Sequence, residues 1–365
     1  MRITLIAGAR PNFMKIAPII DAIKKQNTTN HCIEYRLVHT GQHYDKNMSD
    51  SFFEQLGIPQ PDANLECGGG TQAEQTASIM VRFEKELLEH PADVVLVVGD
   101  VTSTMACSIV AKKLNTQVVH IEAGIRSNDL KMPEEINRMV TDAITDQFYT
   151  TSEFANKNLL QAGISTDRIH FVGNTMIDTL LKQKNNFKKP SFWDTYHLDQ
   201  FSYFVVTLHR PANVDGEAQL KKLLETIIEG SKGLKIVFPV HPRTKKNLES
   251  LGIESNNLLM IEPLSYLEFN YLVQYAKAVI TDSGGITEET TIMGVPCLTL
   301  RDNTERPETV EIGTNVLVGT NPENLPPYFK KLFEGNWKKG ASPEFWDGKT
   351  SERIVASLIK LYAGV

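Results

Sequence analysis

Short runs of β-branched and other apolar residues alternate with amphipathic helical segments along the chain, which limits the possible folds more than any other feature of the sequence. A continuous apolar run such as Val94 to Val98 predicts a strand buried on both faces. Strands of this kind, separated by helices, form parallel sheets with helices on both sides. The predicted strands are residues 3–7, 35–40, 94–98, 118–122, 147–151, 169–173, 203–208, 234–240, 258–263, 278–282, 296–300 and 315–319.

The pattern runs twice, so it predicts an α/β fold with two Rossmann-like, doubly wound parallel-sheet domains. At 365 residues the chain is long enough for two domains of ordinary size. We expect residues 1–170 to form the N-terminal domain and residues 171–353 the C-terminal domain. The polar, lysine-rich stretch from Lys182 to Gln200 is expected to be a surface loop near their junction.

Composition and charge exclude several classes of protein. The net charge is −6 and no basic tract stands out, so nucleic-acid binding is not expected. The four cysteines lie far apart without a CxxC pair, which favours reduced thiols over disulfides or a zinc site. The apolar run at the N-terminus is too short for a signal peptide, and none is long enough to span a bilayer. We therefore expect a soluble, cytoplasmic protein that needs no membrane.

Clusters of polar residues follow the ends of the predicted strands. GARPNFMK follows the first strand, EAGIRS and HRPAN follow later ones, and DSGGITEE and RDNTERPE come last. Ligands of open α/β sheets bind outside the carboxyl ends of the strands. These clusters are therefore expected to line a cleft between the two domains.

The turn Ser283-Gly284-Gly285 precedes a helix that we expect to begin near Ile286. The two glycines would let a phosphate approach the backbone, and a helix N-terminus offers unpaired N–H groups and a favourable dipole. An ordinary strand–helix turn, capped by Ser283, would have the same sequence. Glu289 follows in the first turn, where it could accept hydrogen bonds from a ribose or simply favour the helix dipole.

Arg10 and Lys15 lie on either side of the first strand–helix loop, where two cations would suit a pyrophosphate. Solvated loop charges are the simpler alternative. The loop lacks the glycines of a GxGxxG or Walker A motif. Neither a nicotinamide cofactor nor ATP hydrolysis is therefore indicated, and we expect no cofactor.

Three carboxylates, Asp100, Glu122 and Glu134, follow successive elements of the first half. If they converge, they raise one another's pKa and can act as general acids and bases near neutral pH. The alternative is structural: Asp100 would cap a helix and the glutamates would pair with Arg126 or Arg138.

Further candidates lie in the second half. His209 ends a strand and is followed by arginine, so it could donate to a phosphate or move a proton. His241 holds the corresponding place after the next strand. Phe269 could stack on a base, although its helical spacing also fits a core residue. Arg306, after the CLTL strand, could bind a phosphate or a sugar hydroxyl.

Together the segments GARPNFMKIAP, VVGDVTST, HIEAGIRS, MPEEINR, TLHR, TDSGGITEE and RDNTERPE closely resemble the non-hydrolysing UDP-N-acetylglucosamine 2-epimerases. The match runs in order over nearly the whole chain. It implies a GT-B architecture with a UDP-binding C-terminal domain, a final helix (354–365) that packs back on the first domain, and a homodimer.

The resemblance also implies residue roles. Arg10, Lys15 and His209 would lie at the diphosphate with the Ser283-Gly284-Gly285 turn. Phe269 would lie near the uracil and Glu289 at the ribose. The sugar would be surrounded by Asp100, Glu122, Glu134, Arg138 and Arg306, and the catalytic candidates are Asp100, Glu122, Glu134 and His209.

The implied reaction interconverts UDP-N-acetylglucosamine and UDP-N-acetylmannosamine through elimination of UDP to 2-acetamidoglucal and re-addition. Residues 39–62 also resemble a sister group that acts on UDP-2,3-diacetamido-uronic acids. The sequence leaves room for a GT-B glycosyltransferase, a hydrolysing epimerase or a nucleotide-sugar sensor as well. Pro211 stands where many members have an arginine that helps bind an activating substrate molecule, so we expect such activation to be weak or absent.

Overall fold

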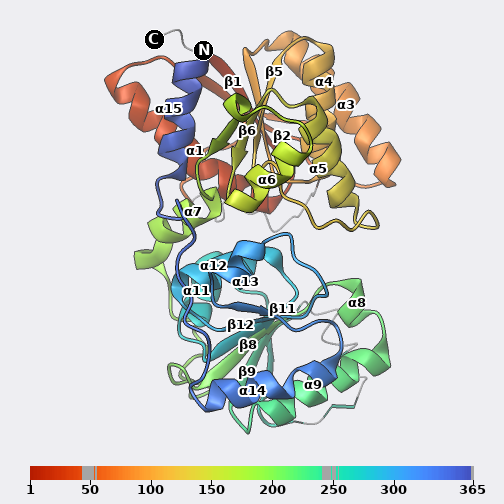
Figure 1. Cartoon of the computed structure of the whole chain (residues 1–365), viewed down its shortest axis with the longest axis vertical. Helices are drawn as coiled ribbons and strands as arrows, with labels where there is room; N and C mark the ends of the chain where they lie inside the picture. Colours follow the sequence, from red (N-terminus) through yellow and green to blue (C-terminus); the bar gives the residue numbers. More distant parts are fainter. Residues whose placement is uncertain (43–52, 54–55, 241–247, 249–251, 254, 363–365) are drawn as a thin grey trace. The chain divides into compact units, whose positions relative to one another are not determined.

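The computed structural model describes residues 1–365 apart from 43–52, 54–55, 241–247, 249–251, 254 and 363–365. The chain divides into two compact units. The first unit contains Met1–Lys182 and Glu344–Val365, and the second contains Gln183–Pro343. Each has its own parallel sheet (Figure 1). The two parallel-sheet α/β units confirm the predicted fold class.

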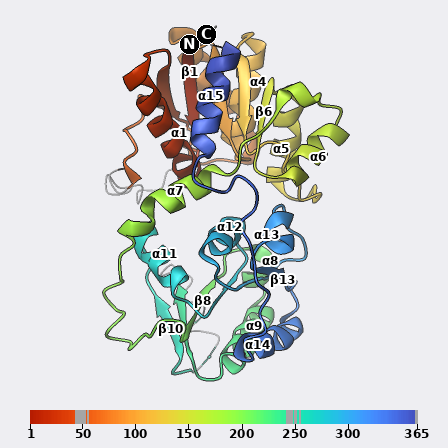
Figure 2. The same ribbon diagram turned by 60° about the vertical axis from the view of Figure 1, so that its left-hand side comes forward.

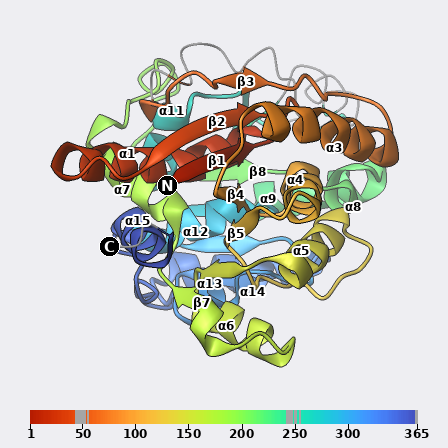
Figure 3. The same ribbon diagram turned by 90° about the horizontal axis from the view of Figure 1, so that it is seen from above.

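The sheet of the first unit has the strand order β3-β2-β1-β4-β5-β6-β7, and neighbouring strands run parallel (Figure 3). Its strands are β1 (Arg2–Ala7), β2 (Glu34–His39), β3 (Ala63–Asn64), β4 (Val94–Val98), β5 (Gln117–Ile121), β6 (Gln147–Thr150) and β7 (Ile169–Phe171). Its helices are α1 (Arg10–Thr29), α3 (Gln72–Glu89), α4 (Thr102–Lys113), α5 (Pro133–Ile144), α6 (Glu153–Gln161), α7 (Thr175–Gln183) and α15 (Thr350–Tyr362), with a 3-10 turn at Thr166–Arg168.

Helices cover both faces of this sheet. Helices α1 and α15 pack together on one side, whereas α3 and α4 pack on the other (Figure 1). Val95 and Val97 of β4 are fully buried in a cluster with Phe83 of α3 and Cys107 of α4. A strand between two helical layers has no solvent-facing side, which explains why β4 is apolar at every position.

The second unit repeats the plan with the order β10-β9-β8-β11-β12-β13. Its strands are β8 (Tyr203–Thr207), β9 (Lys235–Pro239), β10 (Leu258–Ile261), β11 (Ala278–Thr281), β12 (Cys297–Thr299) and β13 (Asn315–Leu317). Its helices are α8 (Pro211–Val214), α9 (Glu217–Gly230), α11 (Tyr266–Gln274), α12 (Gly284–Met293), α13 (Pro307–Glu311) and α14 (Pro326–Phe333), with 3-10 turns at Lys184–Asn186 and Pro322–Asn324.

Alternate residues of β8 point to opposite layers of the second unit. Helices α9 and α14 lie on one side of β8, and α11 lies on the other (Figure 2). Phe204 and Val206 pack in the cluster that includes α9 and α14, whereas Tyr203 and Val205 pack in the cluster that includes α11. The alternation follows from the two-residue period of a strand.

In both sheets, the side on which the chain adds successive strands reverses at an equivalent point. In the first unit the chain adds β2 and β3 on one side of β1 and then returns to the other side with β4. In the second unit β9 and β10 lie on one side of β8, and β11 lies on the other. The loops after β1 and β4, and those after β8 and β11, therefore flank the switch points where α/β sheets bind ligands.

The predicted strands all overlap observed ones, but three details differ from the sequence analysis. Strand β3, only Ala63–Asn64, was not predicted. Helix α12 begins at Gly284 instead of near Ile286, because the extended backbone of Ser283 already serves as its N-cap. The stretch 182–200 is not simply a surface loop, since Trp193 and Leu198 are buried in the core of the second unit.

The two units also divide at other residues than those expected from the sequence. The chain leaves the first unit after Lys182 and not at residue 170, because β7 pairs with β6 and α7 follows it. It re-enters the first unit at Glu344. Among the described residues, every helix is too short or too polar to cross a lipid bilayer.

Candidate functional site

Lys15 and Glu122 form a close ion pair at the carboxyl edge of the first sheet. Lys15 lies in the second turn of α1, and Glu122 follows β5. The Lys15 Nζ atom is 2.6 Å from Glu122 Oε2, and the Glu122 side chain is only 2% exposed. A Cβ atom at Gly99, after β4, would lie 3.5 Å from both of these atoms. The structure therefore brings these two candidates together at the end of β4.

The backbone of Glu122 is left-handed, with φ 65°. This conformation costs a residue with a Cβ about 1 kcal/mol or more and persists only where the surroundings enforce it. Because such strain gathers at functional sites, it is an independent reason to examine this carboxylate.

Asp100 is the second carboxylate at this edge, and Arg138 of α5 binds it. Arg138 Nη2 is 2.5 Å from Asp100 Oδ2, while Arg138 Nη1 is 2.7 Å from Glu135 Oε2. Arg138 is nearly buried, whereas Asp100 keeps 32% of its side chain exposed. Asn137 also donates to the Asp100 carbonyl. Asp100 is therefore held by two neighbouring residues of α5 and remains accessible to a ligand.

Glu135, which the sequence analysis overlooked, anchors this pair. Its carboxylate is 1% exposed and accepts hydrogen bonds from the Ser127 N–H and hydroxyl and from the Asn128 N–H. Burial alone would raise the pKa of Glu135, but the bonds from Ser127, Arg138 and Asn128 hold it below the ordinary value.

The neighbouring Glu134 lies exposed in the first turn of α5. Two adjacent glutamates in a helix point in different directions, and their sequence alone does not tell which is buried. The structure joins Asp100 to Arg138, and Lys15 to Glu122, but gives Glu134 no place in either pair.

A buried histidine also makes hydrogen bonds at this edge of the sheet. His120 of β5 contacts Asp142 Oδ1 through Nδ1 and the Gly99 carbonyl through Nε2, each at 2.8 Å. Asp142 also pairs with Arg126 at 2.7 Å. Burial would raise the pKa of Asp142, but His120 and Arg126 hold it below its ordinary value. The expected partner of the glutamates, Arg126, thus pairs with Asp142.

The loop after β1 is fixed by Asn12. Its side-chain oxygen accepts from the Gly8 and Ala9 N–H groups, each at 3.0 Å, and its Nδ2 donates to the Val98 carbonyl at 3.1 Å. This amide therefore ties together the two strand ends of the first switch point. Arg10 begins α1 just before it and is exposed.

In the second unit, Asp282 follows β11, the strand that pairs with β8 as β4 pairs with β1. Its Oδ1 lies 2.7 Å from Nδ1 of His209, the residue that follows Leu208 at the end of β8. The Asp282 side chain is completely buried, whereas that of His209 is 62% exposed. Burial would raise the pKa of Asp282, but the hydrogen bonds from His209, Arg210 and Asn213 lower it to about 2.

The N-terminus of α12 follows directly. Ser283 is the N-cap residue, but its side chain makes no capping hydrogen bond. A Cβ at Gly284 would lie 2.8 Å from Glu305 Oε1, so a side chain there would displace Glu305. Around Gly285, which is exposed, no heavy atom lies within 4 Å of the Cβ position. The start of α12 therefore has no side-chain cap from Ser283, while the carboxylate of Glu305 lies close to Gly284.

Behind this turn, two buried glutamates of α12 differ in their partners. Glu288 Oε1 pairs with Arg306 Nε at 2.5 Å, and both side chains are nearly buried. Glu289 Oε1 accepts from the Tyr266 hydroxyl at 2.9 Å. Burial and the charge of Glu288 raise the pKa of Glu289 to about 7, although the Tyr266 bond opposes them. Glu289 therefore titrates near neutral pH.

Two candidates remain. Phe269 is half-buried and packs against the core cluster of the second unit, as its helical spacing allows. His241 lies outside the described residues. Within the part of the chain that the structure describes, no group of three or more His, Cys, Asp and Glu residues could hold a metal ion.

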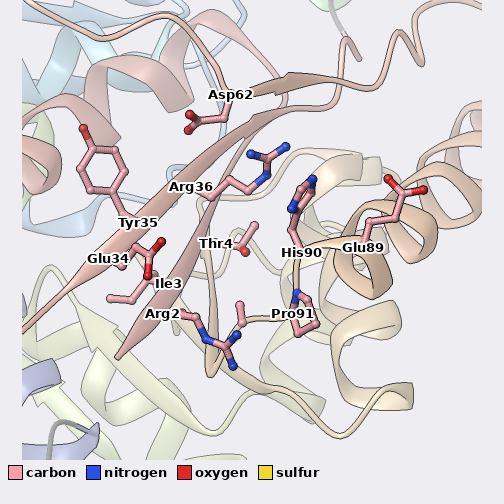
Figure 4. Close-up of a pocket in the computed structure, with 11 residues that line it drawn as sticks. Arg2, Ile3, Thr4, Glu34, Tyr35, Arg36, Asp62, Glu89, His90 and Pro91 are labelled. Atoms are coloured by element: carbon pink, nitrogen blue, oxygen red, sulfur yellow. The ribbon is translucent and has the colours of Figure 1, made fainter.

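A polar hollow of about 410 Å³ lies at the other edge of the first sheet, where β1 and β2 begin (Figure 4). Arg2 and Arg36 line it together with Glu34, Asp62 and Glu89. None of the residues expected at the site is among its lining residues. Three acidic groups against two arginines make it a poor receptor for a diphosphate.

Comparison with known proteins gives consistent results. The family model described as UDP-N-acetylglucosamine 2-epimerase matches residues 25–359. A protein of Methanocaldococcus jannaschii named UDP-N-acetylglucosamine 2-epimerase is 43% identical, over 98% of this chain and 99% of its own. A Pseudomonas aeruginosa protein named UDP-2,3-diacetamido-2,3-dideoxy-D-glucuronate 2-epimerase is 38% identical, over 99% of this chain and 100% of its own.

Solved structures agree with these relatives. The crystal structure of the M. jannaschii UDP-GlcNAc 2-epimerase, in complex with UDP-GlcNAc and UDP, superimposes with a TM-score of 0.86 at 43% identity. The match covers 99% of this chain and 100% of that one.

Proposed function

Because the chain belongs to the UDP-N-acetylglucosamine 2-epimerase family, we propose that it interconverts UDP-N-acetylglucosamine and UDP-N-acetylmannosamine by inverting C2. Family membership and the GT-B fold make the chain an isomerase that acts as an epimerase. The choice of sugar and the chemical route are our proposals.

The observation that carries the proposal is the pairing of opposite charges at the carboxyl edge of the first sheet. The C2 hydrogen of an acetamido sugar is not next to a carbonyl, so its direct removal is difficult. It becomes acidic when the bond from C1 to UDP breaks. The reaction thus needs cations for the leaving diphosphate and carboxylates for the C2 proton. Lys15 and Arg138 supply cations, and Glu122 and Asp100 supply carboxylates. Each cation lies within hydrogen-bonding distance of its own carboxylate.

In the forward step, the C1–O bond to UDP breaks, a carboxylate accepts the C2 proton, and a C1–C2 double bond forms. The products are UDP and 2-acetamidoglucal. In the return step, a proton is added to the opposite face of C2 and a UDP oxygen re-forms the bond to C1. We assign the proton transfers to Asp100, Glu122 and Glu134. Glu134 is exposed and belongs to neither of the two ion pairs.

The remaining candidates bind the rest of the substrate in this proposal. Arg10, Lys15 and His209 bind the diphosphate together with the turn at Ser283. The supporting observation is that this turn leaves the N-terminus of α12 without a side-chain cap. The other assignments are Phe269 near the uracil, Glu289 at the ribose, and Arg138 and Arg306 at the sugar. Homodimer formation also stays a prediction.

Turnover in deuterated water tests the route. If elimination and re-addition occur, deuterium enters C2 with each inversion, and small amounts of UDP and 2-acetamidoglucal leak out. Proton NMR of the reaction mixture detects all three. The variant Glu134→Gln should release more glycal if this carboxylate supports re-protonation. Inversion without deuterium at C2, or activity that requires added NAD, contradicts the route.

The second candidate is 2-epimerisation of a UDP-2,3-diacetamido-uronic acid, which the P. aeruginosa relative favours. Purified protein should be given each UDP-sugar separately and then both together. A higher kcat/KM for the uronic acid would reverse our choice of substrate. Incubation with UDP-N-acetylglucosamine alone also separates epimerisation from glycosyl transfer, from hydrolysis to free N-acetylmannosamine, and from binding without turnover.

A further inference from the structure

The carboxylate of Asp282 uses its two oxygens for different purposes. Oδ2 accepts from the backbone N–H of His209 at 3.0 Å, from that of Arg210 at 2.9 Å and from Asn213 Nδ2 at 3.1 Å. Oδ1 faces the imidazole of His209, with its Nδ1 at 2.7 Å, and also accepts a longer bond from the His209 backbone N–H at 3.3 Å. Oδ2 therefore mainly shapes the loop after β8, whereas Oδ1 is the oxygen that binds the ring.

Shaping a loop at a switch point does not require a negative charge. In the first unit, Asn12 fixes the equivalent loop with a neutral amide that binds only backbone groups. A fully buried carboxylate is more costly to desolvate than an amide and persists where its charge is compensated. Asp282 contacts the side chain of a histidine, whereas Asn12 contacts only backbone groups.

The contact also determines where the protons of the histidine lie. A carboxylate oxygen only accepts, so His209 Nδ1 must donate, and Nε2 is the nitrogen left to act on a ligand. The side chain of His209 is 62% exposed, so a ligand can reach the ring. An ionised carboxylate held against one nitrogen fixes the tautomer and stabilises the imidazolium form.

We propose that Asp282 is a positioning residue for the epimerase reaction: it orients His209 and stabilises its imidazolium, so that Nε2–H donates to the diphosphate oxygen that leaves C1. When the C1–O bond breaks, this oxygen gains negative charge and takes the proton from Nε2, which leaves the imidazole neutral. The proton returns to Nε2 when the bond re-forms. The inference rests on the proposed function, because it assigns Asp282 a part in that same reaction.

Other charged groups near the carboxylate do not replace this partner. Arg210 Nε donates to the Asp282 backbone carbonyl at 3.1 Å, and its contact with the carboxylate is through its own backbone N–H. Asn213 is uncharged and also donates to the Leu300 carbonyl. The pKa of Asp282, lowered to about 2 against the effect of burial, agrees with a carboxylate that stays ionised throughout the working pH range.

The variant Asp282→Asn reverses the contact with little change of shape. The three bonds to Oδ2 require an acceptor, so the amide oxygen takes that place and its NH2 group faces His209 Nδ1. The ring must then accept at Nδ1. We expect kcat to fall by about 100-fold, the lower end of what a general acid contributes, and the Kd for UDP to change by less than about 3-fold. The alkaline limb of the kcat profile should move to lower pH, because the imidazolium loses its counter-charge.

Two further variants separate positioning from loop structure. Asn213→Ala removes two loop bonds, to Asp282 Oδ2 and to the Leu300 carbonyl, but leaves the contact between Asp282 and His209, so its alkaline limb should not move. In the background of His209→Asn, the change Asp282→Asn should lower kcat no further, because it acts through the missing ring. An additive loss in this double variant, or an unmoved alkaline limb in Asp282→Asn, would overturn the inference.

Nitrogen-15 NMR of the histidine ring provides a test that does not depend on turnover or on the stability of a variant. In the wild-type protein without substrate, His209 should carry a proton on Nδ1 throughout the neutral pH range. An unprotonated Nδ1 would overturn the inference even if the protein is an active epimerase. A protonated Nδ1 in a protein that does not epimerise would instead contradict the proposed function.

Discussion

The two switch points of this molecule have the same topology but different chemistry. In the first unit, Asn12 joins the ends of β1 and β4 through three hydrogen bonds to backbone groups. In the second unit, Asp282 joins the ends of β8 and β11 and also binds the ring of His209. The neutral amide fixes a loop, whereas the carboxylate fixes both a loop and a side chain that can be charged.

The two units differ in how the charged side chains at the carboxyl edge of the sheet are paired. In the first unit, the charges at the carboxyl edge pair with one another in Lys15–Glu122 and Asp100–Arg138, so the amide beneath them need not be charged. In the second, a buried negative charge lies beneath an exposed histidine. The first arrangement keeps carboxylates and cations together, and the second holds an exposed histidine ring against a buried carboxylate.

The largest expected effect comes from giving the first switch point the chemistry of the second. The variant Asn12→Asp keeps an acceptor for the Gly8 and Ala9 N–H groups but sets a carboxylate oxygen against the Val98 carbonyl. A buried, uncompensated charge costs about 3–5 kcal/mol. Urea unfolding at pH 7 should show a loss of this size.

The same variant has a diagnostic pH dependence. A protonated carboxyl at position 12 can donate to the Val98 carbonyl as the amide does, so the loss should shrink as the pH falls. Asn12→Ala serves as the control, because its loss should not depend on pH. An equal loss for Asn12→Asp at pH 5 and pH 8 would contradict this account.

The next effect concerns Glu289, a second buried carboxylate of the second unit. Its contribution to stability should change with pH in the opposite direction to that of Asp282. The pKa of Glu289 is raised to about 7, so the folded state holds its proton more tightly than the unfolded state. The resulting stability is complete below pH 4.5 and is lost as the pH rises through about 7. A shift of this size corresponds to about 3 kcal/mol. The variant Glu289→Gln should remove this pH dependence from the free energy of unfolding.

Asp282 should give a somewhat smaller effect of the opposite sign. Because its pKa is lowered to about 2, its contribution to stability is present above pH 3.8 and is lost as the pH falls through about 2. The shift corresponds to about 2 kcal/mol. Asp282→Asn should be less stable than the wild type by this amount at pH 5, and the difference should narrow at pH 2.5. A constant difference would mean that the charge contributes nothing to stability.

The smallest effect distinguishes two helix starts within the second unit. Ser283 makes no capping bond, so Ser283→Ala should change the free energy of unfolding by less than about 0.5 kcal/mol while weakening UDP binding several-fold. Ser265 caps α11 by accepting from the Glu268 N–H, and Ser265→Ala should cost about 1 kcal/mol without weakening UDP binding. Equal losses of stability would show that Ser283 is an ordinary cap.

The sequence is sufficient for the strands and for the edge of the sheet where the candidates gather. Apolar runs such as Val94–Val98 specify buried parallel strands, and polar residues directly after them must lie at the carboxyl edge. Strand β3 is too short, at two residues, to form such a run. The buried Trp193 escaped prediction because the stretch from Lys182 to Gln200 around it is mostly polar and rich in lysine.

The hydrogen-bonding roles were harder to predict, because they depend on contacts between distant segments. Asn12 reaches Val98, which is 86 residues away, and no local pattern distinguishes it from an asparagine in a surface loop. The choice between Glu134 and Glu135 depends on the rotation of α5 and on the loop at Ser127 and Asn128. The two glycines after Ser283 and the carboxylate of Glu134 can be recognised in the sequence. The hydrogen-bonding partners of each carboxylate cannot.

The insertion of the second unit into the first has a consequence for biosynthesis. Helix α15 packs against α1, and Lys25 pairs with Glu352 across 327 residues of sequence. At about 5–20 residues per second, the ribosome needs on the order of half a minute to make the chain between these helices. Throughout that time the face of α1 that contacts α15 lacks its partner, whereas all strands of the second unit, the last of which is β13, are made before α15. The nascent chain therefore needs this face of α1 to be shielded until α15 emerges. The first unit begins first in synthesis but is completed last.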